Sequence, residues 1–229
     1  MSARTVNDIF DKVYLINLDR RSDRLETCNT VLQEHNFVVE RISAVDGDTL
    51  GVDEINKDFL TYISEDHLRG QLGCVMSHHK VLKDAKEKGY GSILILEDDF
   101  KLVSNFEELF EEFYPQVPDD WELLYLGGNH HFHRGVTLKM VTPNVGIPVK
   151  TYTTHAYAVR ESLYDKLIEV FDKDTNNCPA DIGLCHVQKE IKTCYTLWPS
   201  LISQEVGFSD ITHRVEDYTF FLETKGRYW

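Results

Sequence analysis

Continuous apolar runs alternate with amphipathic stretches along the first half of the chain. Runs of mostly aliphatic residues bounded by polar ones are typical of strands buried on both faces of a sheet. They predict strands over residues 12–18, 37–45, 92–96 and 122–128. Apolar residues at helical spacing predict helices over residues 20–34, 71–88 and 105–114. Because strand, helix and strand follow one another within residues 12–45, we expect the first two strands to pair in parallel.

The pattern weakens after Gly128. Residues 129–150 indicate one strand pair at most. The remaining predicted elements are a short strand over 156–159, helices over 161–171 and 180–190, and an extended segment over 195–202. Because no repeat, low-complexity tract or linker interrupts the chain, we expect one mixed α/β domain over residues 1–229.

The strand over residues 92–96 runs directly into Glu97, Asp98 and Asp99. In open α/β sheets, ligands bind at the carboxyl ends of strands. Three carboxylates there are costly to bring together unless a cation neutralises them, and oxygen ligands suit Mn²⁺ or Mg²⁺. Since adjacent strand residues point to opposite faces, Glu97 and Asp99 share a side and Asp98 points away. Asp99 is the predicted direct ligand, with Glu97 acting indirectly; the plainer interpretation is a strand that stops at solvent.

Charge and cysteine content restrict the partners and the compartment. The formal net charge is −14, which disfavours nucleic acid as a partner. No apolar run approaches the ~20 residues that span a bilayer, so no transmembrane segment is predicted, and the first residues lack the apolar core of a signal peptide. Five cysteines without a CxxC pair favour free thiols in a reducing compartment. Together these features predict a cytoplasmic location.

Two further patterns bear on the chemistry. The chain contains neither GxxxxGK[ST] nor GxGxxG, which argues against P-loop and dinucleotide-binding enzymes. A nucleotide held without such loops, at a strand-end carboxylate pair, is typical of nucleotide-sugar enzymes. The histidines His130, His131 and His133 form either a soft-metal site or a polar loop, and we favour the loop.

Eight ordered segments resemble glycosyltransferase family 25, the family of lipopolysaccharide and procollagen galactosyltransferases. They are VYLINLDRRSDR (13–24), SAVDG (43–47), GCVMSH (73–78), ILEDD (95–99), THAY (154–157), PAD (179–181), PSLISQ (199–204) and SDI (209–211). Each is weak alone, but the ordered set covers most of the chain, roughly residues 12–211.

The resemblance implies a GT-A-type fold, with a mixed, mainly parallel central sheet flanked by helices. It also implies a UDP-sugar donor, a divalent cation and inversion at the transferred carbon. A nucleotide-sugar half would occupy about residues 12–128 and an acceptor half about residues 129–229. The run over residues 97–99 would be the family's DxD-type motif, with Glu97 departing from Asp in the first position.

The same resemblance implies roles for residues beside the acids. Asn17 and Arg24 would lie near the nucleotide, Asp46 near the uridine, and Ser77 and His78 near the ribose or phosphates. Each has a plainer interpretation: a capping residue for Asn17, a solvated helix face for Arg24, a turn former for Asp46 and a buried, hydrogen-bonded helix residue for His78.

An inverting transfer requires a general base on the acceptor hydroxyl. Asp181, at a predicted helix start, is the preferred candidate, although it is equally well placed to be an N-cap. Asp210 is the alternative base. His213 or Asp210 is a candidate third ligand of the metal.

The favoured hypothesis is therefore an inverting, metal-dependent transferase. It would move a hexose, galactose or glucose, from a UDP-sugar to a glycan or a hydroxylysine-type acceptor. A non-catalytic module that binds UDP-sugars or glycans on the same fold is the first alternative. A metal-dependent phosphohydrolase is the second, and it would need a further cluster of metal ligands.

Overall fold

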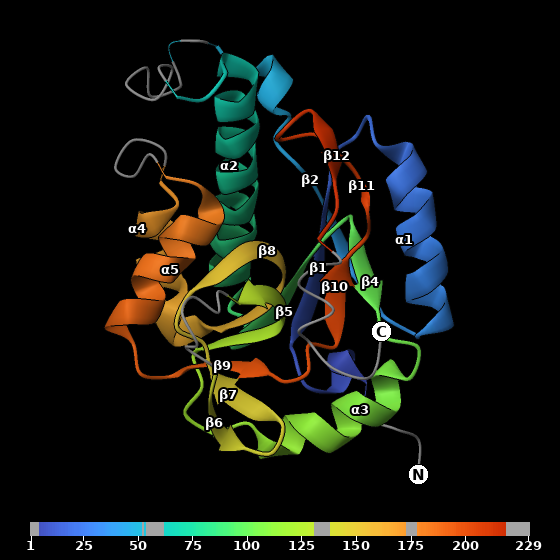
Figure 1. The fold of residues 1–229 in the computed structure, drawn as a ribbon, viewed down its shortest axis with the longest axis vertical. Helices are drawn as coiled ribbons and strands as arrows, with labels where there is room; N and C mark the ends of the chain where they lie inside the picture. The colour runs from blue at the N-terminus through green and yellow to red at the C-terminus, as the bar shows by residue number, and fades with distance from the viewer. Residues whose placement is uncertain (1–4, 52, 54–61, 131–137, 173–177, 219–229) are drawn as a thin grey trace.

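The computed structural model describes residues 5–51, 53, 62–130, 138–172 and 178–218. The main strands are β1 (Lys12–Asn17), β2 (Glu40–Ser43), β3 (Ser92–Glu97), β5 (Leu123–His130), β6 (Lys139–Thr142), β7 (Val145–Ile147), β8 (Thr151–Arg160) and β9 (Cys194–Leu197). They form one sheet in the order β2-β1-β3-β8-β5-β9-β7-β6 (Figure 1). Two small antiparallel pairs join β4 (Phe100–Leu102) to β10 (Ile202–Gln204) and β11 (Gly207–Ser209) to β12 (Arg214–Glu216).

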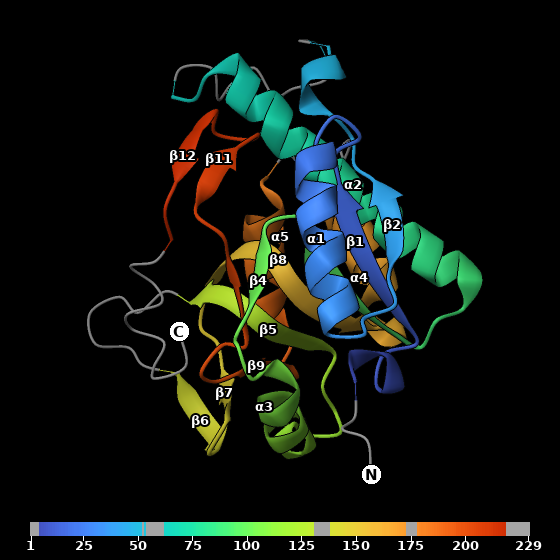
Figure 2. The ribbon, with the colours of Figure 1, turned by 90° about the vertical axis from the view of Figure 1, so that its right-hand side faces the viewer.

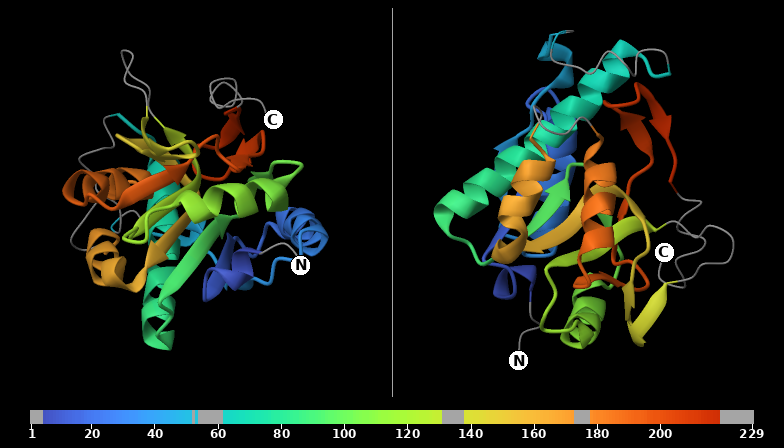
Figure 3. Two further views of the ribbon diagram at one scale, coloured as in Figure 1. Left: turned by 90° about the horizontal axis from the view of Figure 1, so that it is seen from below. Right: turned by 90° about the vertical axis from the view of Figure 1, so that its left-hand side faces the viewer.

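Helices cover both faces of the main sheet (Figure 3). The α-helices are α1 (Ser22–Glu34), α2 (Glu65–Lys88), α3 (Phe106–Phe113), α4 (Tyr164–Val170) and α5 (Ala180–Glu190). Short 3₁₀ turns are η1 (Val6–Asp8), η2 (Gly47–Thr49), η4 (Tyr114–Gln116) and η5 (Glu161–Leu163). No helix in the described ranges is both long and apolar enough to cross a bilayer.

Alternation along β1 and β3 produces the two cores. Val13 and Leu15 pack in one buried cluster with residues of α1 and α3. Tyr14 and Ile16 face the other way, into a cluster with residues of α2, α4 and α5. Because both faces of these strands are covered, their sequences are continuous apolar runs rather than alternating ones.

The predicted α/β class, with a mixed central sheet flanked by helices, is confirmed; the described strand pairs of this sheet are three parallel and four antiparallel. β1 pairs in parallel with β2, as the strand–helix–strand spacing predicts, and also in parallel with β3. β8 runs antiparallel between β3 and β5, and β5 pairs in parallel with β9. Strands from both halves of the chain therefore join one sheet.

Helix α2 begins at Glu65, six residues before the predicted start at Gln71. Ser64 caps it by accepting a hydrogen bond from the backbone N–H of His67 at 3.3 Å. Two glycines near its start, Gly70 and Gly73, weaken the helical pattern of this turn in the sequence. Close packing leaves no room for a side chain at these positions: a Cβ on Gly70 would lie 2.8 Å from Cα of Ile211.

Three strand predictions need correction. Residues 37–39 precede β2 rather than belonging to it, and Phe37 is buried in the core without pairing. β8 is ten residues long, although only residues 156–159 were predicted, because its first half carries buried polar side chains. β4 was not predicted, since three residues after an acidic turn give no pattern; it pairs with β10 in a separate two-stranded sheet.

Gly127 allows β10 to cross β5 at close range. A Cβ at this position would lie 2.0 Å from the carbonyl oxygen of Ile202 and 2.6 Å from Nε2 of His155. The register of β5 against β8 also shifts here. The close approach brings residues 202–204, at the end of the chain's late extended segment, beside the acidic turn.

We expect Gly127→Ala to destabilise the fold by about 1–3 kcal/mol or more, because the new methyl group meets backbone rather than a flexible side chain. Gly207→Ala is the matched control, since a Cβ there meets nothing within 4 Å, and its effect should stay within about 0.5 kcal/mol. Urea unfolding followed by circular dichroism measures both. Equal stability of the two variants would show that β10 does not press on Gly127.

Candidate functional site

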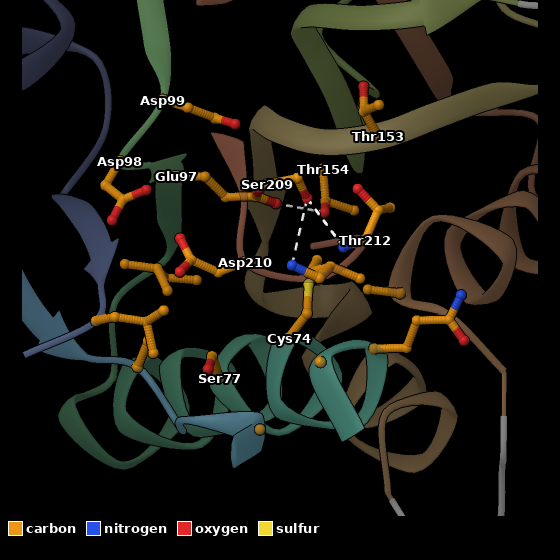
Figure 4. Close-up of a pocket in the computed structure, with 18 of the residues that line it drawn as sticks. Cys74, Ser77, Glu97, Asp98, Asp99, Thr153, Thr154, Ser209, Asp210 and Thr212 are labelled. Carbon is orange, nitrogen blue, oxygen red and sulfur yellow. Dashed lines mark hydrogen bonds between the residues drawn. The ribbon is translucent and has the colours of Figure 1, made fainter. Parts of the chain in front are cut away.

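A pocket of about 290 Å³ opens where β1 and β3 end, near the lower end of the range for small-molecule sites. Helix α2 supplies its floor, and β10, the start of α5 and the β11–β12 hairpin line its sides (Figure 4). This is the strand edge at which ligands bind in open α/β sheets. Residues from both halves of the chain line it.

Both carboxylate oxygens of Asp98 are hydrogen-bonded on the α1 side of the pocket. Its two carboxylate oxygens accept hydrogen bonds from Arg24 Nη1 at 2.7 Å and from Asn17 Nδ2 at 2.8 Å. Arg24 also donates to the carbonyl oxygen of Phe208 at 2.6 Å. Asn17 and Arg24 therefore line the pocket, where they hold the acidic turn and the β11–β12 hairpin together.

Glu97 turns toward α2 and β8. A hydrogen bond of 3.1 Å joins it to Nε2 of His78, and Thr154 donates its hydroxyl proton to the same oxygen. Burial acts to raise the pKa of Glu97, but these two hydrogen bonds outweigh it, and the pKa lies below its ordinary value. His78 is completely buried and also hydrogen-bonded to Tyr157. His78 is therefore a buried, hydrogen-bonded helix residue, as in its plainer interpretation, and it also lines the pocket.

Asp99 has an unsatisfied oxygen. Its Oδ2 accepts a hydrogen bond from Gln204 Nε2 at 3.1 Å, whereas its Oδ1 is buried and has no partner among the described residues. Burial, followed by the charges of Glu97 and Asp98, raises the pKa of Asp99 to about 7. Figure 4 shows Glu97 and Asp99 extending to the same side, with Asp98 apart from them, as strand alternation predicts.

The pocket is strongly acidic. Among the described residues that line it, eight carry carboxylates and two carry guanidinium groups: Asp46, Glu97, Asp98, Asp99, Asp181, Glu205, Asp210 and Glu216, against Arg20 and Arg24. Such a lining repels an anionic ligand unless a cation is bound with it.

A hard divalent cation fits the residues around Asp99. Asp99 Oδ1 and Gln204 Oε1 are both buried, both lack a hydrogen-bond partner in the described part of the chain, and belong to side chains that are bonded to each other. Carboxylate and amide oxygens are the ligands that Mn²⁺ and Mg²⁺ prefer. Unpaired buried acceptors are rare, and a bound ion is one way in which such groups are satisfied.

Asp46 and Ser77 line the pocket on the side of η2. Asp46 accepts a hydrogen bond from the N–H of Asp48 at 3.1 Å and pairs with Arg20 at 2.7 Å. Burial acts to raise the pKa of Asp46, but the bonds from Arg20 and Asp48 lower it overall. Ser77 donates to the carbonyl oxygen of Gly73 and accepts from the N–H of Val45 at 2.8 Å. Both side chains therefore shape the pocket wall.

The two candidate bases differ in their surroundings. Asp181 accepts hydrogen bonds only from backbone N–H groups in the described structure, those of Thr153 at 3.3 Å and Ile182 at 2.8 Å, and burial raises its pKa. Asp210 has both oxygens engaged in ion pairs, one with Arg20 and one with Arg21. Because two arginines hold both oxygens of Asp210, it is less free to meet an acceptor hydroxyl, so the geometry favours Asp181.

The histidine predictions fare differently. His213 lies in the turn between β11 and β12 with φ of 54°, against the ring of Phe208, and it is not among the described residues that line the pocket. His130 is not in a polar loop: it is the buried last residue of β5, hydrogen-bonded to Thr151 and Thr196. His131 and His133 lie outside the described residues.

Thr153, Thr154 and Gln204 are among the lining residues that were not predicted as site residues. Thr153 has φ of 69°, a left-handed conformation that is strained for a β-branched residue and often marks a functional site. Nothing in the sequence signals this backbone angle. Thr154 and Gln204 lie within segments of the family pattern, but their positions beside Glu97 and Asp99 depend on β8 and β10 reaching the pocket.

The raised pKa of Asp99 predicts a pH-dependent stability. Since the pKa of Asp99 in the folded state, about 7, lies above its ordinary value of 3.8, the stability that the protonated carboxyl contributes is full below about pH 4 and is lost as the pH rises through about 7. In EDTA, Asp99→Asn should gain stability over the wild type between these values, by at most about 1.4 kcal/mol per pH unit. Urea unfolding at several pH values measures the difference, with the exposed Glu108→Gln as control; a constant difference contradicts the prediction.

Comparisons with known proteins agree on the family. The family described as "Glycosyltransferase family 25 (LPS biosynthesis protein)" matches residues 10–181. Procollagen galactosyltransferase 1 of Danio rerio is 33% identical over 129 residues, 52% of this chain and 21% of that protein. Inactive glycosyltransferase 25 family member 3 of Homo sapiens is 30% identical over 170 residues, 69% of this chain and 29% of that protein.

Among solved structures, a glycosyltransferase involved in the glycosylation of the major capsid of PBCV-1 aligns with 70% of this chain and 64% of its own, at 9% identity and a TM-score of 0.38. This chain spans less than a third of the length of the two curated relatives. The family match, however, covers the acidic turn, the floor of the pocket and Asp181. The chain belongs to glycosyltransferase family 25.

Proposed function

We propose that this chain is a metal-dependent, inverting transferase that moves a hexose from a UDP-sugar to a hydroxyl group. The observation that carries the proposal is the unsatisfied Asp99 Oδ1 in a pocket whose lining is dominated by carboxylates. A diphosphate enters such a pocket only with a divalent cation. Membership of a family of glycosyltransferases supplies the class of reaction.

Asp99 and Gln204 are the residues that would hold the cation, through Oδ1 and Oε1. When bound, it supplies positive charge for the departing diphosphate. Asp98 is not needed as a ligand, because Asn17 and Arg24 already satisfy its two oxygens. Its part in the reaction is to hold the turn so that Asp99 faces the pocket.

Asp181 is the proposed general base. In the transfer, the acceptor oxygen forms a bond to the anomeric carbon while the bond from that carbon to the UDP oxygen breaks, and the acceptor proton passes to the Asp181 carboxylate. Burial raises the pKa of Asp181, which makes its anion a stronger proton acceptor. The N–H groups of Thr153 and Ile182 fix the orientation of the carboxylate.

Galactose is the proposed donor sugar, because two of the relatives are named as procollagen galactosyltransferases. Glucose is the alternative donor. For the acceptor, we propose a hydroxyl of a glycan or of a protein side chain of the hydroxylysine type. The pocket volume of about 290 Å³ suits the diphosphate and sugar better than a whole acceptor.

A non-catalytic binding module is the second candidate. It is favoured by one observation: a relative that aligns over 69% of this chain carries the name inactive glycosyltransferase 25 family member 3. This chain would then bind UDP-sugar with Mn²⁺ but release no UDP. Calorimetry and a UDP-release assay on the same sample separate the two functions.

Asp99→Ala should abolish Mn²⁺-dependent release of UDP from UDP-galactose, because it removes the only buried carboxylate oxygen in the described pocket that has no partner. We expect a fall of about 10²–10³-fold or more, as for a lost electrostatic contact in the transition state. Glu108→Gln, on the exposed side of α3, is the control and should match the wild type. Full activity of Asp99→Ala would refute the proposal.

Asp181→Asn and Asp210→Asn should have different kinetic effects. Asp181→Asn keeps the size of the side chain but removes the base, so we expect kcat to fall by about 10²–10⁴-fold with UDP affinity unchanged. Asp210→Asn weakens the pairs with Arg20 and Arg21 that hold the hairpin, so KM should rise while kcat changes less. The reverse pattern would assign the base to Asp210.

A further inference from the structure

Cys74, His78 and Glu97 form a cluster of ligand atoms of three chemical kinds. The thiol sulfur, a ring nitrogen and a carboxylate oxygen all lie within 4.8 Å of one another. Cys74 and His78 are four residues apart on α2, so their side chains share one face of the helix. Glu97 reaches the same point from the end of β3.

This donor set differs in softness from the oxygens of Asp99 and Gln204. Sulfur and imidazole nitrogen with one carboxylate oxygen suit Zn²⁺, and equally Co²⁺ or Cd²⁺, whereas Mn²⁺ and Mg²⁺ prefer oxygen alone. A tetrahedral ion with bonds of about 2.0–2.3 Å needs its ligand atoms about 3.5 Å apart. The three atoms now lie within 4.8 Å of one another, so binding would require their side chains to move closer together.

The nitrogen ligand is already oriented by a neighbour. The Tyr157 hydroxyl lies 2.9 Å from Nδ1 of His78, and this directs Nε2 of the same ring toward Glu97, at 3.1 Å. A histidine that binds a metal through one nitrogen is typically fixed in this way through the other. Tyr157 and His78 are both fully buried, so the ring cannot turn freely.

The thiol is open to the pocket. Cys74 lines it and is half-buried, and Figure 4 shows its sulfur rising from α2 toward the middle of the pocket, below Glu97 and Thr154. All five cysteines have free thiols, so Cys74 is not engaged in a disulfide. An ion entering from the pocket therefore meets all three ligands, and its fourth position faces the pocket.

We propose that Cys74, His78 and Glu97 bind a thiophilic divalent ion of the Zn²⁺ class at the floor of the pocket. Binding forms a metal–sulfur bond and releases the thiol proton to solvent, without any transfer of electrons. His78 Nε2 and the Glu97 carboxylate exchange their mutual hydrogen bond for bonds to the ion.

The spectroscopic test uses Co²⁺ as the probe. The reduced, metal-free protein is titrated with CoCl₂, and absorption from sulfur-to-cobalt charge transfer is followed in the near ultraviolet. The wild type should gain this band with one equivalent of Co²⁺, and Cys74→Ser should not. Cys178→Ser, another half-buried thiol outside the cluster, is the matched control and should keep the band.

Two further variants keep the test decisive if Cys74→Ser is poorly folded. Glu97→Gln and Tyr157→Phe leave the thiolate in place, so the band should remain while the dissociation constant for Co²⁺ rises by about 10–100-fold. A wild type without the band, a band that persists in folded Cys74→Ser, or unchanged Co²⁺ affinity in both Glu97→Gln and Tyr157→Phe would overturn the inference.

One consequence rests on the proposed function. Because Glu97 belongs both to this cluster and to the acidic turn, Zn²⁺ should weaken Mn²⁺-dependent UDP binding in the wild type and leave it unchanged in Cys74→Ser. Calorimetry with UDP and Mn²⁺ measures this. Absence of Mn²⁺-dependent UDP binding in the wild type counts against the proposed function alone, since the Co²⁺ band does not depend on it.

Discussion

The crowding of carboxylates at the end of β3 is the constraint on which the rest of the site depends. Like charges in a half-buried turn are unfavourable unless each is paired or hydrogen-bonded. Asp98 is satisfied from α1 through Arg24, and Glu97 from α2 through His78, so the two helices are tied to the same turn. Asp99 retains an oxygen without a donor in the described structure. In the proposed reaction, that remaining charge is the one a divalent ion neutralises.

Charge pairing also explains how residues 208–210 are held beside residues 20–24. Asp210 is separated by almost the whole chain from Arg20 and Arg21, yet it pairs with both, and Arg24 holds the neighbouring Phe208 carbonyl. Figure 2 shows the β11–β12 hairpin standing beside α1 as a result. Single exposed ion pairs contribute little to stability. A network in which one carboxylate joins two arginines fixes a geometry, and it makes one wall of the pocket depend on charge rather than on core packing.

Sequence reasoning succeeded where the signal is local. The apolar runs of β1 and β3 follow from burial on both faces, the parallel pairing of β1 with β2 follows from the helix between them, and the acids at 97–99 lie at the strand edge where such sites form. It failed where the structure depends on distant partners. The polar half of β8 is stabilised by bonds such as that of Thr151 to His130, and β4 exists because β10 crosses Gly127 to pair with it.

The site shows the same division, and it shows why a residue type does not fix a role. In the sequence alone, Asp181 and Asp210 are equivalent. In the structure, Asp181 accepts hydrogen bonds from backbone N–H groups, whereas Asp210 accepts them from two guanidinium groups. Glu97 belongs both to the acidic turn and to the cluster with Cys74 and His78 on α2. In the two proposals a hard ion binds Asp99 and Gln204, whereas a soft ion binds Glu97 with Cys74 and His78, so the metal present, and not the fold alone, would decide which chemistry the pocket supports.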